Sequence, residues 1–396
     1  MNNKLYFFLL SAGSILTVLG LIVWLRVYHA QLLSPVDQNS SFSFLQILGT
    51  KSVEKKLVYG FLPYWNLKKT SLQPELPQLS YFALTIQADG SVRLTEDGNT
   101  EPGYHKLQSE DFLELISQAQ TQNTQLELVL AQFNNDAIAG FLNSDKAQEK
   151  FFTNLNSILL AYPFTGVNVD IEYSGEITDN LRAKYVAFLT KLNQHLAKTN
   201  PETKISIDVY GSAASKHLIW DLPAIAPQVD YVIMMAYDYH RRNSPISGPV
   251  APLFGADSIW ESDITKHLND LITQVPAKKI LLGVPFYGYE WRTTSRESRE
   301  NTYPNSGSTA SFERVQEILK QKEQLQVQEN WDENALAPYL TYKENGAIYT
   351  IYYEDSRSLS YKADLVRQLD LAGIAIWALG YEGQHRELWD VIERKL

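Results

Sequence analysis

The sequence predicts an α/β protein whose main domain is a barrel of eight parallel strands, each followed by a helix: the (β/α)8 or TIM barrel. Strand-like and helix-like segments alternate from about residue 56 onward, which is typical of repeated β-α units. The chain has 396 residues and 44% apolar content, which suits one elaborated barrel better than two small domains. One strand also carries acids on a face that would normally be apolar. Acids at the end of a strand fit a TIM barrel, because the catalytic residues of such barrels lie at the carboxyl ends of their strands.

Eight segments have the character of barrel strands. They are residues 57–62, 80–86, 126–133, 164–173, 204–210, 231–237, 280–285 and 373–379. Amphipathic helical runs lie between them, for example at 111–120, 146–160 and 181–198. These runs are expected to form the outer ring of helices.

One interval is too long for an ordinary loop between a strand and a helix. It separates the seventh strand from a helix that begins near Ser356. It contains a helical run at 312–324 and two strand-like runs at 338–343 and 347–353, joined by the turn sequence Glu344-Asn345-Gly346. We therefore expect a small α+β subdomain, residues 292–355, inserted between strand 7 and helix 7.

The fourth strand places three polar side chains on one face. Asn168, Asp170 and Glu172 project the same way because side chains alternate along a strand. The opposite face is β-branched and apolar, which favours a buried strand over the alternative of a solvated edge strand. Burying unpaired carboxylates is costly or forces them to take up protons, so packing does not explain these acids. Two like charges so close cannot both ionise freely, and one carboxyl can keep its proton and act as a general acid.

This strand resembles a known family signature. Gly166-Val167-Asn168-Val169-Asp170-Ile171-Glu172 is similar to the pattern Asp-x-x-Asp-x-Asp-x-Glu of glycoside hydrolase family 18, the chitinase-like TIM barrels. Thr165 and Asn168 stand where the pattern has its first two acids, whereas Asp170 and Glu172 are retained. Asn at this position resembles the branch with bacterial spore-germination and cortex-lytic proteins, which acts on peptidoglycan or related glycans. Since Asn168 cannot take up a proton, we expect an altered acid limb of the pH profile.

Three later motifs extend the resemblance in the same order along the chain. Residues 234–240, Met-Met-Ala-Tyr-Asp-Tyr-His, are similar to the Met-x-Tyr-Asp motif that ends the sixth strand. Residues 283–291 and 372–380 look like the seventh-strand and eighth-strand motifs. The resemblance thus covers nearly everything from residue 56 onward, including the insertion after the seventh strand.

The resemblance implies hydrolysis of β-linked N-acetylglucosamine glycans with retention, in which the substrate's own acetamido group is the nucleophile. Glu172 would be the general acid and later the base. Asp170 would hold the acetamide N–H and stabilise the oxazolinium ion, and Tyr237 would donate to the acetamide carbonyl oxygen. The glycan can be chitin-like or peptidoglycan.

Six further residues are expected to contact the substrate. They are Asn168, Asp238, Trp377, Tyr287, Trp291 and Trp65. Trp377 would floor the sugar site, and the other two tryptophans would lie near the mouth, where flat rings suit the faces of pyranoses. For any single tryptophan, a packed position in the core or rim is the alternative.

A glycan-binding, lectin-like barrel with little or no turnover is the alternative function. Such members typically lack the terminal acid of the signature, and Glu172 is present, which favours an enzyme. His240 and Asp238 have no third ligand at metal spacing, and no phosphate-binding glycine loop is found, so the sequence predicts neither a metal nor a cofactor. With a net charge of −10, nucleic acid is not an expected partner.

The N-terminal region predicts a membrane anchor. After a short tail, residues 1–4, the segment 5–25 has no charged residue, and as a helix it would span about 31 Å, enough for a bilayer core. Bulky residues follow at 24–30, where a removable signal peptide would have a small-residue cleavage site. We therefore expect a single-pass protein of the cell membrane with a linker at 26–55 and the catalytic domain, 56–396, outside. Secretion after signal cleavage is the alternative.

Overall fold

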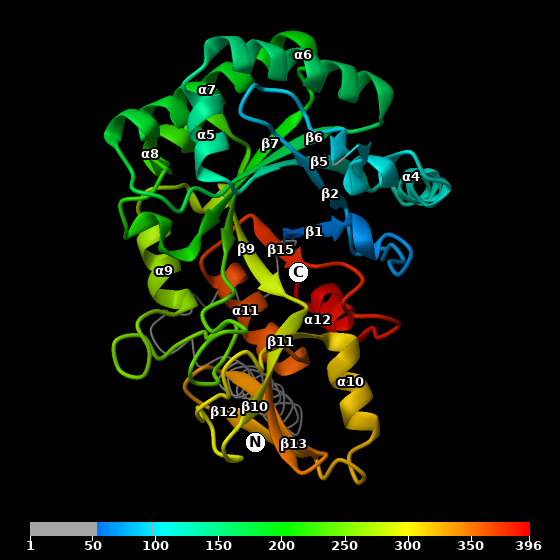
Figure 1. Ribbon diagram of the computed structural model, residues 1–396, viewed down its shortest axis with the longest axis vertical. Helices are drawn as coiled ribbons and strands as arrows, with labels where there is room; N and C mark the ends of the chain where they lie inside the picture. Colours follow the sequence, from blue (N-terminus) through cyan, green and yellow to red (C-terminus); the bar gives the residue numbers. More distant parts are fainter. Residues whose placement is uncertain (1–53, 97) are drawn as a thin grey trace, which may run out of the picture. The chain divides into compact units, whose positions relative to one another are not determined.

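The computed structural model describes residues 54–96 and 98–396 (Figure 1). The expected membrane span at 5–25 lies outside the described residues, as does nearly all of the expected linker at 26–55. Within the described part of the chain, no helix is both long and apolar enough to cross a membrane. Lys56–Leu396 form one compact unit.

Eight parallel strands close into a barrel, which confirms the predicted fold class. The order around the barrel is β1-β15-β9-β8-β7-β6-β5-β2. The strands are β1 (Leu57–Pro63), β2 (Gln78–Thr85), β5 (Gln125–Gln132), β6 (Gly166–Ile171), β7 (Lys204–Tyr210), β8 (Tyr231–Met235), β9 (Ile280–Pro285) and β15 (Gly373–Trp377). Every one of them falls on a segment that the apolar pattern identified.

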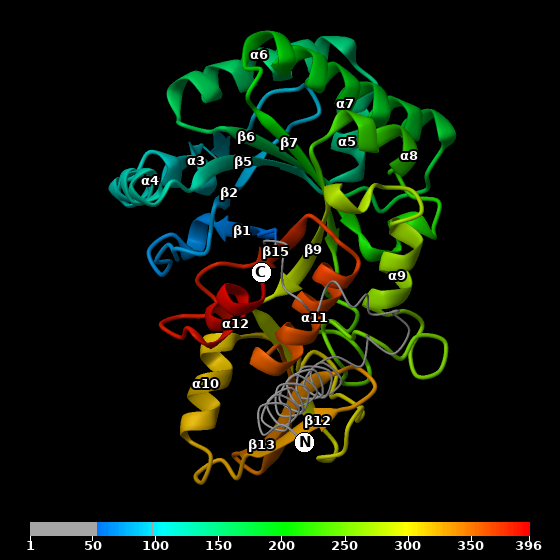
Figure 2. The same ribbon diagram turned by 180° about the vertical axis from the view of Figure 1, so that it is seen from behind.

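Helices follow the strands and lie outside the barrel in both views (Figures 1 and 2). They are α3 (Pro102–Leu107), α4 (Glu110–Gln122), α5 (Asn135–Leu142), α6 (Asp145–Ala161), α7 (Asp179–Thr199), α8 (Leu222–Ile225), α9 (Ile264–Leu271), α11 (Ser356–Gln368) and α12 (Glu387–Lys395). Helix α7 illustrates how the sequence specifies them. The Thr178 side chain caps it by accepting from the Leu181 backbone N–H, and Tyr185, Phe188 and Leu192 form a buried stripe at helical spacing.

A second sheet is inserted between β9 and α11. Its strands are β10 (Tyr287–Thr293), β11 (Ser308–Ser311), β12 (Gln328–Asp332), β13 (Ala337–Glu344) and β14 (Ala347–Tyr352), in the antiparallel order β11-β10-β14-β13-β12. With α10 (Phe312–Lys320), they form a lobe below β9 and β15 in Figures 1 and 2. Asn345 and Gly346, at φ 51° and 78°, make the tight β13–β14 turn, as their sequence predicts.

The inserted sheet begins earlier than the expected residue 292. The Phe286 N–H still bonds to the Trp377 carbonyl of the barrel at 2.7 Å, but from Tyr287 the chain already pairs with β11. The seventh-strand motif at 283–291 is therefore divided between the barrel and the inserted sheet. This division determines where the aromatic residues of that motif lie.

The interior of the barrel is apolar in one part and polar in another. Tyr59, Phe61, Val129, Ile233 and Leu281 pack together as an apolar cluster. In the same interior, completely or almost completely buried polar side chains come from adjacent strands; they are Glu127, Asn168, Asp170, Ser206 and Asp208. Such groups are stable inside a barrel only when they are hydrogen-bonded or protonated.

Candidate active site

A cavity of about 450 Å³ lies against the ends of the barrel strands. Four carboxyl groups line it: Asp170, Glu172, Asp208 and Asp238. Many aromatic side chains line it as well; they are Phe82, Phe133, Tyr210, Tyr237, Tyr239, Tyr287, Tyr289, Trp377 and Tyr381. Acids surrounded by aromatic rings fit a neutral, hydroxyl-rich ligand such as a sugar.

Asp170 lies on β6 with only 4% of its surface exposed. One of its carboxyl oxygens, Oδ1, has no hydrogen-bond partner within the described protein, although it is fully buried. Burial raises the pKa of Asp170 well above its ordinary value, and the charges of Asp208 and Glu172 raise it further. Because Asp170 lines the cavity, a ligand bound there is a candidate partner for this oxygen.

Glu172 follows the last residue of β6 and is partly buried at the cavity. Its backbone N–H bonds to the Gln132 carbonyl at 3.1 Å, which continues the register of the barrel for one more residue. Burial raises the pKa of the Glu172 carboxyl, and a hydrogen bond from the Tyr210 hydroxyl and the charge of Arg241 oppose part of that rise. The carboxyl therefore keeps its proton to higher pH than an exposed glutamate, which suits a general acid.

Asn168 lies deeper in the barrel than its expected role as a substrate contact would require. Its side chain is completely buried and does not line the cavity. Its Nδ2 donates to Ser206 Oγ at 3.0 Å and to Asp208 Oδ1 at 3.2 Å, so it connects β6 to β7. The structure thus gives Asn168 a supporting position behind Asp170.

Tyr237 and Asp238 lie two and three residues beyond the end of β8 and line the cavity, as the motif predicts. Asp238 adopts φ 63°, a left-handed conformation that Asp tolerates better than most residues. Its Oδ1 accepts hydrogen bonds from the hydroxyls of Tyr287 at 2.5 Å and Tyr289 at 2.9 Å. Asp238 therefore fixes two tyrosines of the inserted sheet beside Tyr237.

The three expected tryptophans lie in three different environments. Trp377 lines the cavity and packs edge-on against Phe82 at 4.8 Å between ring centroids. Trp65 is 47% exposed and also meets Phe82 edge-on, at 6.1 Å, so it can extend the aromatic surface. Trp291 is completely buried, and its Nε1 donates to the Arg241 carbonyl at 3.2 Å. The expectation that Trp291 stacks on a sugar at the mouth therefore does not fit, because its ring faces are covered.

Several cavity residues were not identified from the sequence. Asp208 and Tyr210 come from β7, Arg241 from the segment after β8, and Phe133 from the end of β5. The sequence of β7 held a usable signal, because positions 206, 208 and 210 are polar at alternate residues, as on the fourth strand. The other residues come from connecting segments that carry no comparable pattern.

Arg241 is the only lysine or arginine among the described residues that line the cavity. Its Nε donates to the Asp238 carbonyl at 3.3 Å and lies 4.0 Å from Asp238 Oδ2. Its side chain is 64% exposed, so the guanidinium can reach solvent or a ligand. It supplies the positive charge that opposes the rise in the pKa of Glu172.

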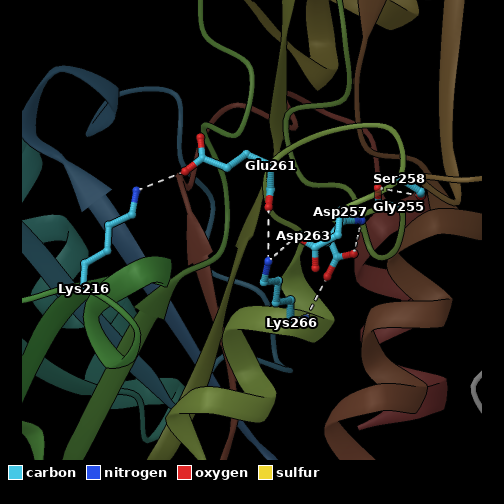
Figure 3. Close-up of polar contacts among 8 residues, drawn as sticks. Lys216, Gly255, Asp257, Ser258, Glu261, Asp263 and Lys266 are labelled. Atoms are coloured by element: carbon cyan, nitrogen blue, oxygen red, sulfur yellow. Dashed lines mark hydrogen bonds and ion pairs between the residues drawn. The ribbon is translucent and has the colours of Figure 1, made fainter.

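The segment between β8 and α9 forms one side of the cavity region, and polar contacts hold it in place (Figure 3). Asp263 accepts from the Ala256 N–H at 2.8 Å and from the Lys266 N–H at 2.7 Å, and Lys266 pairs with Asp257 at 2.6 Å. Helix α9 then presents His267, whose Nδ1 lies 2.9 Å from the Tyr239 hydroxyl at the cavity wall. These contacts hold the segment against helix α9.

No group of three or more His, Asp or Glu side chains in the described ranges is arranged to hold a metal ion. His240 Nδ1 instead lies 3.0 Å from the Pro249 carbonyl, and its ring packs edge-on against Trp260. The imidazole therefore has a structural partner.

The fold and the site together define a member of a known family. The family described as glycosyl hydrolases family 18 matches residues 38–382, so this chain belongs to it. Relatives in this family are glycoside hydrolases, and they include enzymes of the bacterial spore cortex and chitinases.

Two relatives from Bacillus subtilis show the degree of similarity. The chain is 26% identical to the putative sporulation-specific glycosylase YdhD over 62% of its own length and 54% of that protein. It is 24% identical to the cortical fragment-lytic enzyme over 80% of its own length and 68% of that enzyme. The chain thus spans only about half of the first relative and two thirds of the second.

Among solved structures, a family 18 chitinase from Cycas revoluta in complex with (GlcNAc)4 superimposes with a TM-score of 0.71. The alignment covers 86% of this chain and 99% of the chitinase, at 18% sequence identity. At that identity the match shows a common fold.

Proposed function

We propose that the protein hydrolyses β-linked N-acetylglucosamine-containing glycans with retention, using the substrate's own acetamido group as the nucleophile. The observation that carries this proposal is the pair of buried acids at the end of β6. Asp170 and Glu172 both line the cavity, and burial raises the pKa of each. Family 18 is a known exception to the mechanism with two protein carboxylates, and it needs only one acid at the glycosidic oxygen.

Glu172 protonates the leaving oxygen and later removes a proton from the attacking water. Asp170 binds the acetamide N–H through its unpartnered Oδ1 and stabilises the positive oxazolinium ion. Tyr237 is next to both acids at the cavity and donates its hydroxyl to the acetamide oxygen, which aligns that oxygen for attack. Asp238 and Trp377 hold the sugar by hydrogen bonds and by ring contact.

We propose bacterial peptidoglycan as the first substrate to test and chitin oligomers as the second. The similarity to the cortical fragment-lytic enzyme over most of the chain supports the first, and the chitinase relatives support the second. The exposed rings of Trp65 and Phe133, at 47% and 50%, widen the aromatic surface beyond one sugar and support binding of a polymer.

The full-length chain should release products from fluorogenic N-acetylglucosamine oligomers or from purified peptidoglycan. Glu172→Gln should lower turnover by on the order of 1,000-fold or more, because the amide cannot supply a proton. Glu176→Gln, an exposed residue in the loop just beyond, is the matched control and should behave like wild type. Equal turnover by wild type and Glu172→Gln would overturn the proposed mechanism. Oligosaccharide binding without turnover by any of the three proteins would support a lectin-like function instead.

We also propose that residues 5–25 anchor the protein in the cell membrane, with the barrel outside and the linker at 26–55 between them. The absence of charge over that segment supports an anchor. An anchored protein should sediment with membranes after a high-salt wash and be cut by protease added to intact cells. Recovery in the soluble fraction of the medium would favour cleavage and secretion.

A further inference from the structure

We propose that Asp208 is a positioning residue for Asp170, and that the two carboxyls hold one proton between them. An acid at position 168, as in the signature, could share a proton with Asp170, but Asn168 cannot. Asp208 on the neighbouring strand supplies the second carboxyl instead. The inference rests on the proposed function, because it concerns how Asp170 obtains its charge. The inference assigns a role to a residue on β7, which lies outside the four sequence motifs that resemble family 18.

The register of the barrel places the two acids side by side. On the parallel pair β6–β7, Asn168 is opposite Ser206 and Val169 is opposite Ile207. One more residue along both strands brings Asp170 opposite Asp208. Neighbouring strands lie about 4.8 Å apart, so paired side chains on the same face are in close proximity. Both side chains line the same cavity, with 4% and 3% of their surfaces exposed.

Asn168 holds Asp208 in this position. Its amide Nδ2 donates to Asp208 Oδ1 at 3.2 Å and to Ser206 Oγ at 3.0 Å. The Ser206 hydroxyl in turn donates to Glu127 Oε2 at 3.1 Å, and the Tyr59 hydroxyl donates to the same oxygen at 2.6 Å. An amide at position 168 therefore orients the carboxyl on the next strand but cannot itself share a proton.

The electrostatic surroundings agree with a shared proton. Burial raises the pKa of Asp208 and of Asp170 well above the ordinary value, and the charge of Asp208 raises the pKa of Asp170 further. The titratable groups that face Asp208 from other elements are acids and tyrosines: Glu172 after β6, Glu127 on β5, Tyr59 on β1, Tyr237 after β8 and Tyr185 on α7. No cation is among them, so two neighbouring carboxylates would both remain uncompensated.

A shared proton gives Asp170 its negative charge when the reaction needs it. With one proton on the pair, the single negative charge is stabilised, and full ionisation of both acids is disfavoured. As positive charge develops on the substrate's acetamido group, the proton rests on Asp208 and the negative charge on Asp170. When the oxazolinium is hydrolysed, the pair returns to its original state, so no proton is gained or lost.

The test is the pH profile of kcat/KM for Asp208→Asn in the full-length protein. The new amide can still accept the hydrogen bond from Asn168, so a merely structural role predicts an unchanged profile. A shared proton predicts that the acid limb moves to higher pH, because the first proton leaves a proton-sharing pair more readily than it leaves a lone buried Asp170. Charge repulsion alone predicts the opposite direction, because loss of the Asp208 charge would lower the pKa of Asp170. Activity on the acid side should then fall by about tenfold or more, with KM nearly constant. Asp332→Asn, a buried aspartate of β12 outside the cavity, is the matched control.

A double variant that moves the second carboxyl to position 168 provides a further test. Asn168→Asp combined with Asp208→Asn moves the second carboxyl from β7 to β6, next to Asp170, and should return the acid limb toward its wild-type position. An unchanged limb in folded Asp208→Asn would overturn the inference, and so would a double variant that stays displaced. Thermal unfolding and oligosaccharide binding establish that each variant is folded. Glu172→Gln is measured in parallel, because its activity tests the proposed function independently of Asp208.

Discussion

At the scale of single residues, Arg241 tunes the acid that donates the proton. Its positive charge holds the pKa of Glu172 below the value that burial alone would give. Arg241→Gln should therefore raise the pKa of Glu172, so that the carboxyl stays protonated to higher pH and the alkaline limb of kcat/KM moves upward. The displacement should be modest and should shrink in high salt, since the side chain is 64% exposed.

The matched control is Arg242→Gln, which removes the same charge from the neighbouring residue that does not line the cavity. An alkaline limb that moves downward in Arg241→Gln, or that moves equally in both variants, would contradict this role for Arg241.

The sequence identified the site residues whose position follows from the end of the strand that carries them. Asp170, Glu172, Tyr237, Asp238 and Trp377 lie where barrel strands end, and all five line the cavity. What it could not provide is which side chains stand next to them, since that depends on the register between strands. Asp208 is beside Asp170 only because β6 and β7 pair as they do.

At the scale of elements, a buried ion pair joins the inserted sheet to the barrel helices. Glu354, just after β14, and Lys362 on α11 lie 2.8 Å apart with 1% and 0% of their side chains exposed. Lys362→Met leaves the carboxylate buried without its partner, and we expect it to lower the free energy of unfolding by about 3–5 kcal/mol. Urea denaturation at neutral pH would measure the loss.

The double variant Lys362→Met/Glu354→Leu removes both charges and should regain most of that stability. Lys343→Met, at an exposed position of β13, is the control and should change stability by less than about 0.5 kcal/mol. A small effect of Lys362→Met alone would mean that Glu354 is neutral in the folded protein or reached by water.

The elements themselves followed largely from local pattern. All eight barrel strands were predictable, because apolar, β-branched runs that alternate with amphipathic helices indicate a fold of repeated β-α units. The start of the inserted sheet was not predictable, since Tyr287–Thr293 follows β9 after a single residue and no turn sequence separates the two strands. Where the chain leaves the barrel is decided by pairing with β11 and β14, and this is also why Trp291 is buried.

At the scale of the whole molecule, buried acids make stability depend on pH. Burial raises the pKa of Glu127 and of Glu382 to about 7, against 4.5 when exposed. A raised pKa in the folded state stabilises the protein below pH 4.5, and that stabilisation is lost as the pH rises through 7. Histidines 195, 240 and 267 have lowered pKa values and act in the opposite direction below about pH 6.5.

The range to examine is pH 6.5 to 8. In its lower part an exposed histidine is still partly protonated, so the three histidines oppose the two glutamates there. Across that range each of the two glutamates should contribute a fall of about 0.8 kcal/mol in the free energy of unfolding. Urea denaturation at several pH values would measure it, and Glu382→Gln should make the decline less steep. An equal slope for wild type and Glu382→Gln would contradict the assignment of a neutral, buried Glu382.

The barrel is closed by the pairing of β1 with β15, with Leu57 opposite Gly373. Lys56 and Leu396 are also joined, by a backbone hydrogen bond of 3.0 Å. During synthesis, β1 leaves the ribosome long before β15 exists, and its open edge must wait for almost the entire barrel to be translated. The barrel therefore cannot close before β15 has been synthesised, and until then the exposed edge of β1 is a surface that a chaperone would have to protect.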